Sequence, residues 1–440
     1  MDTLRFDLSR GAGKFKILNA TNGGPWHKRH TSDQSRSNMA DYKAARIPYS
    51  RNHDSGVVGI YGGPYSHDIT RIFPNFDADV TDPASYDFAC TDESILCTLD
   101  AGTETFFRLG QTIEHQIKKH GTLPPKDFYK WAQICEHIIL HYNHGWADGF
   151  ELGIKYWEIW NEPDLDPDDS TNKRTWGGTQ AQFFDLYEIT ARHLKSRFPE
   201  LMIGGPALAY REEWADMFLS EMKRREVPID FFSWHVYCNE PNVLAIKSER
   251  IKALLEKNGY GNAESILNEW NYANSKGWGE GAFGYTVMTI HGINGAAFIM
   301  SVISVAQKAD GIDMLMYYDT RPSVFCGAFD FYSGKPLKGY YPLMWYGKFY
   351  DMKEYIPCEN DVENIYTLCG TDENGKILCV VTHYSDDDGT PPTDVKLDFG
   401  REGKFELYLL DNERDGEPVG TTDKTEFNMK CHSCILLKEI

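Results

Sequence analysis

The stretch KYWEIWNEPDLD (Lys155–Asp166) decides the fold when it is compared with ESILNEWNY (Glu264–Tyr272), which follows later in the chain. Each begins with an apolar run and contains an Asn-Glu pair, where a buried strand is expected to pass into a loop. Pro163 ends the first run, because proline donates no ladder hydrogen bond and disfavours a helical conformation for Glu162. The two stretches therefore predict two strands whose ends each present a glutamate.

Similar short apolar runs alternate with amphipathic stretches over most of the chain, as in a parallel α/β fold. The predicted strands are Lys16–Ala20, Arg46–Arg51, Thr105–Leu109, Tyr156–Trp160, Met202–Gly205, Phe231–Val236, Ser265–Asn268 and Met314–Tyr318. The predicted helices include Lys126–His144, Thr179–Arg197, Glu212–Arg225 and Ser248–Asn258. Eight strands separated by helices predict an α/β fold of the (β/α)₈ TIM barrel type, with the active site at the carboxyl ends of the strands.

The texture of the sequence changes at about Tyr346. Short alternating runs separated by Asp, Asn and Gly follow, which is typical of a small antiparallel β-sandwich. They are Ile365–Leu368, Lys376–Thr382, Val395–Phe399, Lys404–Leu410 and Ser433–Lys438. The opening run Thr3–Leu8 also alternates and is expected to pair with this sheet. We predict a catalytic barrel over residues 15–345 and a β-sandwich accessory domain over residues 1–14 and 346–440.

Composition and charge exclude several classes of protein. The formal net charge of −20 disfavours nucleic acid or an anionic membrane as a partner, since both require a basic face. The N-terminus lacks the basic and apolar segments of a signal peptide, and no apolar run approaches the ~18–20 residues that span a bilayer. Ten cysteines without a disulfide spacing indicate reduced thiols, so we expect a cytoplasmic protein.

The two glutamates suit hydrolysis of a glycosidic bond, which needs one carboxyl group as acid and a second as nucleophile or base. Either Glu162 or Glu269 alone could be a strand-ending residue that faces solvent, but their occurrence together favours a joint role. A separation of ~5–5.5 Å would indicate double displacement with retention of configuration. The flanking Trp160, Trp270 and Tyr272 offer aromatic faces of the kind that stack on sugar rings.

Further stretches make the chain resemble the clan A glycoside hydrolases, and most closely glycoside hydrolase family 39, which includes β-xylosidases and α-L-iduronidases. The matching stretches are SRNHD (Ser50–Asp54), EIWNEPD (Glu158–Asp164), GGPA (Gly204–Ala207), DFFSWHVY (Asp230–Tyr237), LNEWN (Leu267–Asn271) and FCGAFDFYSGKPLKGYYPLMWYGKF (Phe325–Phe349). The resemblance covers nearly the whole chain and implies the same barrel and sandwich.

The resemblance also implies a role for individual residues. Glu162 corresponds to the acid/base and Glu269 to the nucleophile. The residues expected to contact the substrate are Asn161, His53, His235, Tyr237, Trp270 and Tyr318. Asn161 corresponds to the donor to the sugar 2-OH, and Tyr237 to a neighbour of the nucleophile. A Tyr237 hydroxyl that donates to Glu269 would favour its charged form, and that charge would raise the pKa of Glu162.

The loop after the eighth strand departs from the family pattern. The family's xylosidases carry acidic residues there that contact the far hydroxyls of the sugar, whereas this chain reads YYDTRPSVFCG (Tyr317–Gly327). The favoured interpretation is that Arg321 pairs with Asp319 as a structural cation. Alternatively, the planar fork of Arg321 could bind a carboxylate on the substrate, which keeps uronic-acid sugars open.

Two other clusters are interpreted as structural. His137, His141 and His144 recur at a helical spacing that could form a metal-binding face. They fall on a helix before the fourth strand, however, and such a helix lies outside the barrel. The run Cys431–Cys434 lacks a second pair of ligands. No metal and no organic cofactor are expected.

The predicted function is that of a retaining glycoside hydrolase, exo-acting on a β-xyloside or a related pentoside. The alternatives are another clan A specificity (α-L-arabinofuranosidase, α-L-iduronidase or β-glucosidase) and a non-catalytic carbohydrate-binding protein. The intact Asn-Glu pairs disfavour the last. The expected partner is an oligosaccharide or glycoside substrate, and the resemblance leaves a homo-oligomer open.

Overall fold

The computed structural model describes residues 1–26, 36–53, 65–279, 281–323, 325–359 and 362–440. Eight parallel strands close into a barrel in sequence order, which confirms the predicted (β/α)₈ fold. They are β2 (Ile17–Asn22), β3 (Tyr49–Arg51), β4 (Glu104–Leu109), β5 (Tyr156–Ile159), β6 (Met202–Leu208), β7 (Phe231–Cys238), β8 (Glu264–Tyr272) and β9 (Met314–Tyr317). Every predicted barrel strand overlaps one of these.

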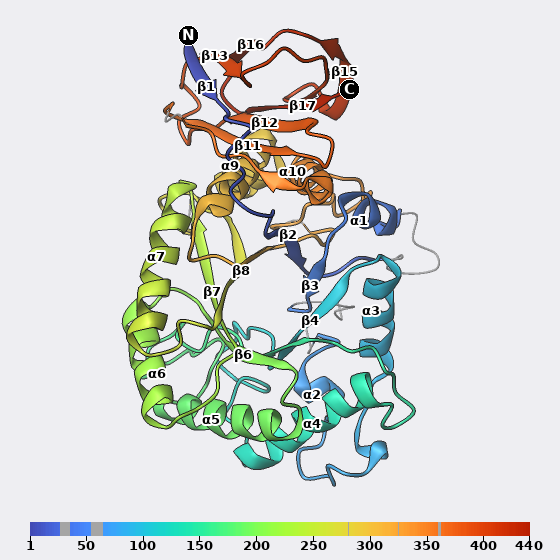
Figure 1. Ribbon diagram of the computed structural model, residues 1–440. Coiled ribbons are helices and arrows are strands. Elements are labelled where there is room, and N and C mark those ends of the chain that lie inside the picture. The colour runs from blue at the N-terminus through green and yellow to red at the C-terminus, as the bar shows by residue number, and fades with distance from the viewer. Residues whose placement is uncertain (27–35, 54–64, 280, 324, 360–361) are drawn as a thin grey trace.

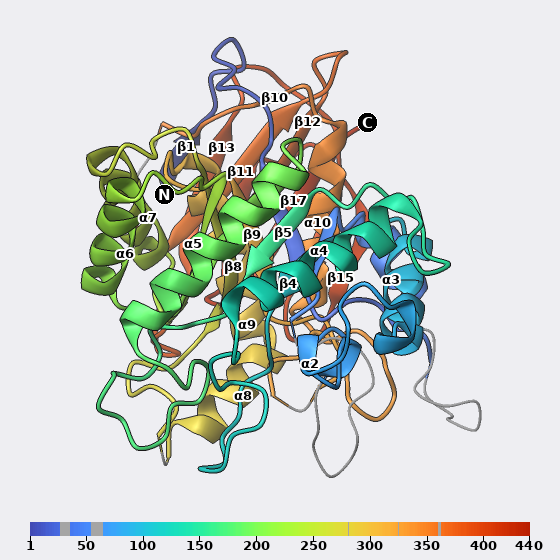
Figure 2. The same ribbon diagram turned by 90° about the horizontal axis from the view of Figure 1, so that it is seen from below.

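Helices surround the barrel, as Figures 1 and 2 show from two directions. They are α1 (Met39–Ala45), α2 (Ile69–Ile72), α3 (Ala89–Asp100), α4 (Phe128–His144), α5 (Gln180–Arg197), α6 (Glu212–Arg224), α7 (Asn242–Lys257), α8 (Phe283–His291), α9 (Ile293–Lys308) and α10 (Tyr340–Gly347), with 3-10 turns η1 (Pro83–Ser85) and η2 (Lys348–Asp351). α7 begins at Asn242 rather than at the predicted Ser248, because the fixed φ of Pro241 suits the start of a helix.

The interior of the barrel is apolar at one end and polar at the other. At the apolar end, away from the carboxyl ends of the strands, a separate small core consists of Ala20, Phe106, Tyr156, Phe231, Ile266, Met314 and Met316. Successive side chains of a strand alternate between the interior and the surrounding helices. The next inward positions after Phe106 and Tyr156 are Arg108 and Glu158, both fully buried. Polar chemistry is therefore concentrated at the carboxyl ends of the strands.

The accessory module consists of two sheets, with strand orders β1-β13-β16 and β10-β11-β12-β17-β14-β15. The strands are β1 (Asp2–Arg5), β10 (Glu354–Tyr355), β11 (Ile365–Thr371), β12 (Ile377–His383), β13 (Thr393–Asp398), β14 (Phe405–Leu410), β15 (Asp415–Thr422), β16 (Glu426–Met429) and β17 (Ser433–Glu439). β1 pairs in parallel with β13, so the N-terminal run joins the C-terminal sheets, as Figure 1 shows in blue beside orange.

Three strands of this module were not predicted: β10, β15 and β16. β15 is mostly exposed and reads DGEPVGTT, so it lacks the apolar alternation that reveals a strand. The module packs on the barrel through α9, whose Phe298 shares one core with Leu436 of β17 and Val380 of β12. Among the described residues no single helix is long and apolar enough to cross a membrane; α8 and α9 together meet that criterion, with a bend of 74° between them.

Candidate active site

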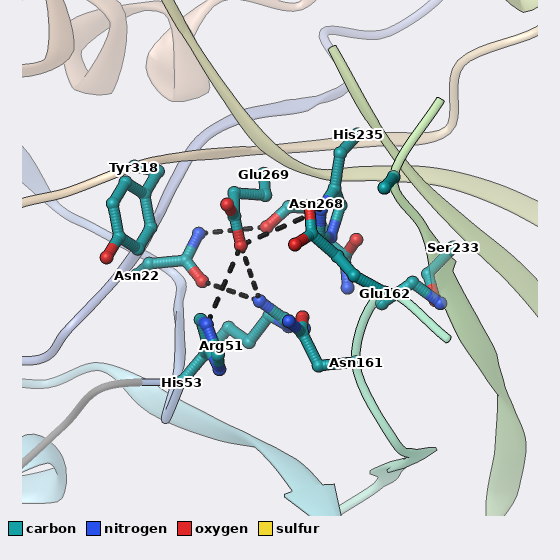
Figure 3. A network of polar contacts seen from close by, with 12 residues as sticks. Asn22, Arg51, His53, Asn161, Glu162, Ser233, His235, Asn268, Glu269 and Tyr318 are labelled. Atoms are coloured by element: carbon teal, nitrogen blue, oxygen red, sulfur yellow. Dashed lines mark hydrogen bonds and ion pairs between the residues drawn. The ribbon is translucent and has the colours of Figure 1, made fainter. Parts of the chain in front are cut away.

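The predicted pair of glutamates comes together at the carboxyl end of the barrel (Figure 3). Glu162 follows β5, and Glu269 lies in β8. One carboxylate oxygen of each and a ring nitrogen of His235 all lie within 4.8 Å of one another. The Glu162 side chain is 14% exposed and that of Glu269 is 8% exposed. The two groups are therefore largely removed from water and close enough to act on one bond.

The backbone around Glu162 is held in an unusual conformation. Trp160 and Glu162 have φ values of 73° and 48°, in the left-handed region that residues other than glycine rarely adopt. This turn ends β5 at Ile159, one residue before the predicted end. The Glu162 amide donates to the carbonyl of Ala207 on β6 at 2.9 Å. The loop is fixed further by the buried Asp164, whose carboxylate accepts three backbone hydrogen bonds of 2.7 to 3.0 Å from the residues just before α6.

Both carboxylate oxygens of Glu269 accept hydrogen bonds. The Tyr237 hydroxyl donates to Oε1 at 2.8 Å, and Nη1 of the fully buried Arg51 donates to Oε2 at 3.2 Å. Burial raises the pKa of Glu269 and the charge of Glu162 raises it further, while His235, Arg51 and Tyr237 act in the opposite direction. The predicted tyrosine contact is present, but burial has the largest effect, so this pKa lies above its ordinary value.

His235 contacts both glutamates. Its Nδ1 lies 2.9 Å from Oε1 of Glu162 and 3.8 Å from Oε2 of Glu269. Burial lowers the pKa of His235 to about 4, so the imidazole is neutral at neutral pH. Lys247 on α7 fixes the local backbone by donating to the His235 carbonyl at 2.7 Å. His53 also faces the pair, with its Nε2 4.0 Å from Oε2 of Glu269.

Arg51 is the centre of a buried network that sequence reasoning missed. Its Nε donates to Oε2 of Glu158 at 2.7 Å, its Nη1 to Oδ1 of Asn22 at 3.1 Å and its Nη2 to Oδ1 of Asn161 at 2.6 Å. Because Asn161 accepts through its oxygen in this bond, its Nδ2 group keeps its capacity to donate hydrogen bonds. The available signal was a charged residue in each of two predicted barrel strands, Arg51 and Glu158, since such residues are rarely buried without partners.

Glu158 is satisfied by donors from two further strands. Its Oε1 accepts from Oγ of Ser233 on β7 at 2.6 Å and from Nδ2 of Asn268 on β8. The register between β7 and β8 shifts next to these residues, between Trp234 and His235. With this irregularity, Asn268 reaches Glu158 in the interior while the next residue, Glu269, faces the active site. The network therefore joins five strands beneath the two carboxylates.

The prediction that Trp270 contacts the substrate is wrong. Trp270 follows the inward-facing Glu269, so it points out of the barrel, where it is fully buried 5.4 Å from the ring of Tyr317 and 6.4 Å from that of Phe298. Trp160 and Tyr272, the other expected sugar platforms, are buried as well. Strand alternation, which places neighbouring side chains on opposite faces, accounts for the orientation of Trp270 and Tyr272.

Tyr318 and Arg321 lie together after β9. Nη2 and Nε of Arg321 donate to Oδ2 of the buried Asp319 at 2.7 and 3.0 Å, which is the pairing that was favoured from the sequence. Nη2 also lies 3.3 Å from the Tyr318 hydroxyl. The Tyr318 ring is 6.3 Å from that of His53, and Figure 3 places it beside Asn22 and Glu269. Asp54 of the SRNHD stretch lies outside the described residues.

Within the described ranges, the groups closest to a metal-ligand arrangement are those of Glu162, His235 and Glu269. Both oxygens of Glu269 and Nδ1 of His235 already make hydrogen bonds to other side chains of the protein. The three histidines of α4 do not converge: His141 lies 3.1 Å from Asp92, while His144 stacks on Phe198.

Comparison with known proteins relates part of the chain to one family of glycosyl hydrolases. The model of glycosyl hydrolases family 39 matches residues 43–260, about half of the chain, including Arg51, Glu162 and His235. The chain is therefore similar to the glycosyl hydrolases of family 39. A β-xylosidase of Geobacillus stearothermophilus is 36% identical over 126 residues, which is 28% of this chain and 23% of that protein. A β-xylosidase of Caldicellulosiruptor saccharolyticus is 29% identical over 187 residues, which is 40% of this chain and 36% of that protein.

Solved structures share the fold of this chain over its whole length. A glucosidase from Croceicoccus marinus has a TM-score of 0.79 at 20% identity and covers 100% of this chain and 99% of its own. A β-xylosidase from Caulobacter crescentus has a TM-score of 0.68 at 16% identity, with the same coverage. An α-L-arabinofuranosidase from Thermotoga maritima has a TM-score of 0.68 at 13% identity and covers 100% of both chains. At these identities the likeness concerns the fold alone.

Proposed function

We propose that the protein is a retaining glycoside hydrolase, exo-acting on β-xylosides or related pentosides by double displacement. The observation that carries this proposal is the approach of the Glu162 and Glu269 carboxylates to within 4.8 Å. Retaining enzymes hold their carboxyl groups ~5–5.5 Å apart, whereas inverting enzymes need ~6.5–9.5 Å to admit a water molecule between them. The spacing therefore supports retention.

In the first step, Glu269 attacks the anomeric carbon and Glu162 gives its proton to the glycosidic oxygen of the leaving group. The product is a glycosyl ester of Glu269. In the second step, Glu162 takes a proton from a water molecule that attacks the same carbon, and the ester bond breaks. The bonds from Arg51 and Tyr237 support the first step because they hold the attacking carboxylate in one orientation.

The change of role of Glu162 follows from electrostatics. Before the first step the negative charge of Glu269 favours the protonated form of Glu162, since two carboxylates this close repel each other. Ester formation removes the charge of Glu269, so the repulsion that disfavours the charged form of Glu162 is lost and Glu162 can act as a base. The neutral His235, 2.9 Å from Glu162, adds no charge to this exchange at neutral pH.

The curated relatives support a pentoside substrate, because both are β-xylosidases. The orientation of Asn161 supports binding of a 2-OH, which xylosides, arabinosides and glucosides all carry. Arg321 contributes little to a uronic-acid specificity, since two of its nitrogens donate to Asp319. A neutral pentoside is therefore favoured over an iduronide, with β-glucosides and α-L-arabinofuranosides as the other candidates. A cytoplasmic location is proposed as well; the ten free thiols support it.

A panel of 4-nitrophenyl glycosides tests the proposal: β-xyloside, α-L-arabinofuranoside, β-glucoside, α-L-iduronide and β-glucuronide. We expect the β-xyloside to give the highest kcat/KM. Proton NMR of the product formed in the first minutes should then show the β-anomer before mutarotation. Release of the α-anomer would contradict retention. Loss of one sugar at a time from a xylo-oligosaccharide would support exo action. If no glycoside is hydrolysed, the alternative of a non-catalytic carbohydrate-binding protein is favoured.

A further inference from the structure

A loop of the accessory module reaches the barrel strands that carry the nucleophile. The loop connects β12 with β13 and contains Asp386. Oδ1 of Asp386 accepts a 2.6 Å hydrogen bond from the hydroxyl of Tyr272. Oδ2 accepts a second 2.6 Å hydrogen bond, from Nδ2 of Asn239. One carboxylate of the sandwich thus joins two residues of the barrel.

Both barrel partners lie at the tips of neighbouring strands. Tyr272 is the last residue of β8, and Asn239 directly follows β7. The pairing of the two strands ends at Cys238 and Tyr272, followed by a 3.0 Å backbone bond from Ala273 to Cys238. Strand ends open more easily than strand centres, because fewer backbone bonds hold them. Asp386 adds a side-chain bridge where the backbone ladder stops.

The same two strand tips carry Glu269 and its hydrogen-bond donor. Glu269 lies three residues before Tyr272 on β8, and Tyr237 lies on β7 two residues before Asn239, which follows that strand. The 2.8 Å bond from the Tyr237 hydroxyl to Oε1 of Glu269 therefore connects the same two strands that Asp386 connects a few residues further on. A change in the spacing of the tips changes the length of this bond.

The chemistry at position 386 fits a two-armed bridge. A carboxylate accepts through both oxygens at once, whereas an asparagine would offer one acceptor to two donors. The arms are themselves fixed: Tyr272 is fully buried against Phe298, and the Tyr384 hydroxyl donates to the Asn239 carbonyl at 2.7 Å. The bridge therefore ends on rigid partners and can transmit the position of the module to the strands.

We propose that Asp386 is a positioning residue, through which the accessory module sets the geometry between Tyr237 and Glu269. The proposal rests on the role proposed above for Glu269 as nucleophile. Asp386 acts through Tyr272 and Asn239, and its two hydrogen bonds hold the ends of β7 and β8 together. The sandwich is thereby part of the catalytic apparatus rather than an independent appendage.

The test variant is Asp386→Asn, because it preserves side-chain volume and removes one acceptor. Carbodiimide labelling across a pH series, read by peptide mass spectrometry, reports the protonated fraction of Glu269 without any substrate. Among the described residues, the ionisable groups that face Glu269 are those of Tyr237, Arg51, His235, His53, Glu162 and the buried thiol Cys326. The hydrogen bond from Tyr237 lowers the pKa of Glu269, so weakening it should raise the labelling midpoint by roughly half a pH unit.

Asp388→Asn is the matched control. Asp388 lies in the same loop, but its Oδ1 accepts a 2.9 Å bond from Asn294 on α9 and lies 3.8 Å from Nδ1 of His432, so its hydrogen bond and ion pair are not with β7 or β8. This variant makes the same change of charge and should keep the wild-type midpoint. Tyr237→Phe should show the full shift, and adding Asp386→Asn to it should shift the midpoint no further, because both changes act through one hydrogen bond.

The proposal is overturned if Asp386→Asn keeps the wild-type midpoint, or if its shift adds to that of Tyr237→Phe. If Asp386→Asn does not fold, Tyr272→Phe replaces it, since this variant keeps the buried ring and removes one arm of the bridge. It must shift the midpoint in the same direction for the proposal to stand. Circular dichroism and thermal unfolding establish that each variant is folded.

Kinetic measurements on the same variants distinguish failure of this proposal from failure of the proposed function. On a glycoside that the wild type hydrolyses, Asp386→Asn should lower kcat by roughly tenfold with KM changed less than about twofold, because it disturbs orientation rather than binding. Asp388→Asn should match the wild type. If no glycoside is hydrolysed and the labelling shift still appears, the proposed function fails and the positioning role of Asp386 stands. If the enzyme is active and the two Asn variants label alike, the positioning role fails alone.

Discussion

The Tyr237 hydroxyl and the Glu269 carboxylate meet across the gap between β7 and β8, 2.8 Å apart and largely out of contact with water. In this position the hydroxyl opposes the effect of burial, which raises the pKa of Glu269. The hydrogen bond thus helps to keep ionised the carboxylate that the proposed mechanism requires as a nucleophile. Tyr237 is also the residue through which Asp386 is proposed to act on Glu269.

Tyr237→Phe should move the acidic limb of the pH profile of kcat/KM to higher pH. The removed hydrogen bond favours the charged form of Glu269, so its loss raises the pH at which Glu269 ionises in the free enzyme. A hydrogen bond to a charged group contributes about 1.5–3 kcal/mol, and one pKa unit corresponds to about 1.4 kcal/mol. We expect a shift of roughly one unit. An unmoved acidic limb would show that Tyr237 does not tune this carboxylate.

Glu269→Gln should abolish turnover and leave the fold intact. A carboxamide cannot form the glycosyl ester, and each tenfold loss in rate corresponds to about 1.4 kcal/mol of barrier. We expect a loss of at least about a thousandfold. In the wild type, a 2-deoxy-2-fluoro glycoside should label Glu269, as peptide mass spectrometry can show. A label on another carboxylate would assign the nucleophile elsewhere.

Glu162→Ala should depend on the leaving group. An activated aryl glycoside needs no protonation, so its first step should survive while the second step becomes limiting. Added azide should then restore turnover and give a glycosyl azide of retained configuration, since this anion needs no general base. Equal rate losses for activated and unactivated substrates, together with no effect of azide, would remove Glu162 from the acid/base role.

Arg51→Met should destabilise the protein strongly, because it leaves Glu158 buried without its cation. Breaking a buried ion pair from one side costs about 3–5 kcal/mol, whereas replacing both partners by apolar residues is often nearly neutral. The double variant Arg51→Met, Glu158→Met should therefore recover much of the loss in urea unfolding. It should not recover activity, because Arg51 also donates to Glu269 and Asn161. Equal stability of single and double variants would contradict the pairing.

His67 should make stability depend on pH. It is buried, and burial together with the charge of Arg108 lowers its pKa to about 3. The unfolded chain protonates this histidine near pH 6.5 and the folded chain only near pH 3. Stability should therefore fall as the pH falls through that window, by up to about 1.4 kcal/mol per pH unit from this group. Urea unfolding at pH 7 and pH 5 should show a smaller difference for His67→Asn than for the wild type.

The sequence by itself determined the barrel and the positions of its two glutamates. Apolar runs of strand length that alternate with helical stretches report burial on both faces of a parallel sheet, and this pattern is local. The Asn-Glu pairs at the ends of two such runs placed Glu162 and Glu269 correctly, since strand ends of a closed barrel share one face. The exposed β15 gave no such signal, because its side chains bury too little apolar surface to alternate.

Only the tertiary structure decided how side chains from different strands combine. The direction of Trp270 depends on strand parity and on the irregularity next to His235, and a shift of one residue reverses the face to which a side chain points. Arg51 draws its partners Asn22, Glu158 and Glu269 from three other strands, and Asp386 reaches Tyr272 from another module. Such contacts join residues far apart in the chain, so no local pattern encodes them; they exist because closure of the barrel and docking of the sandwich bring those residues within hydrogen-bonding distance.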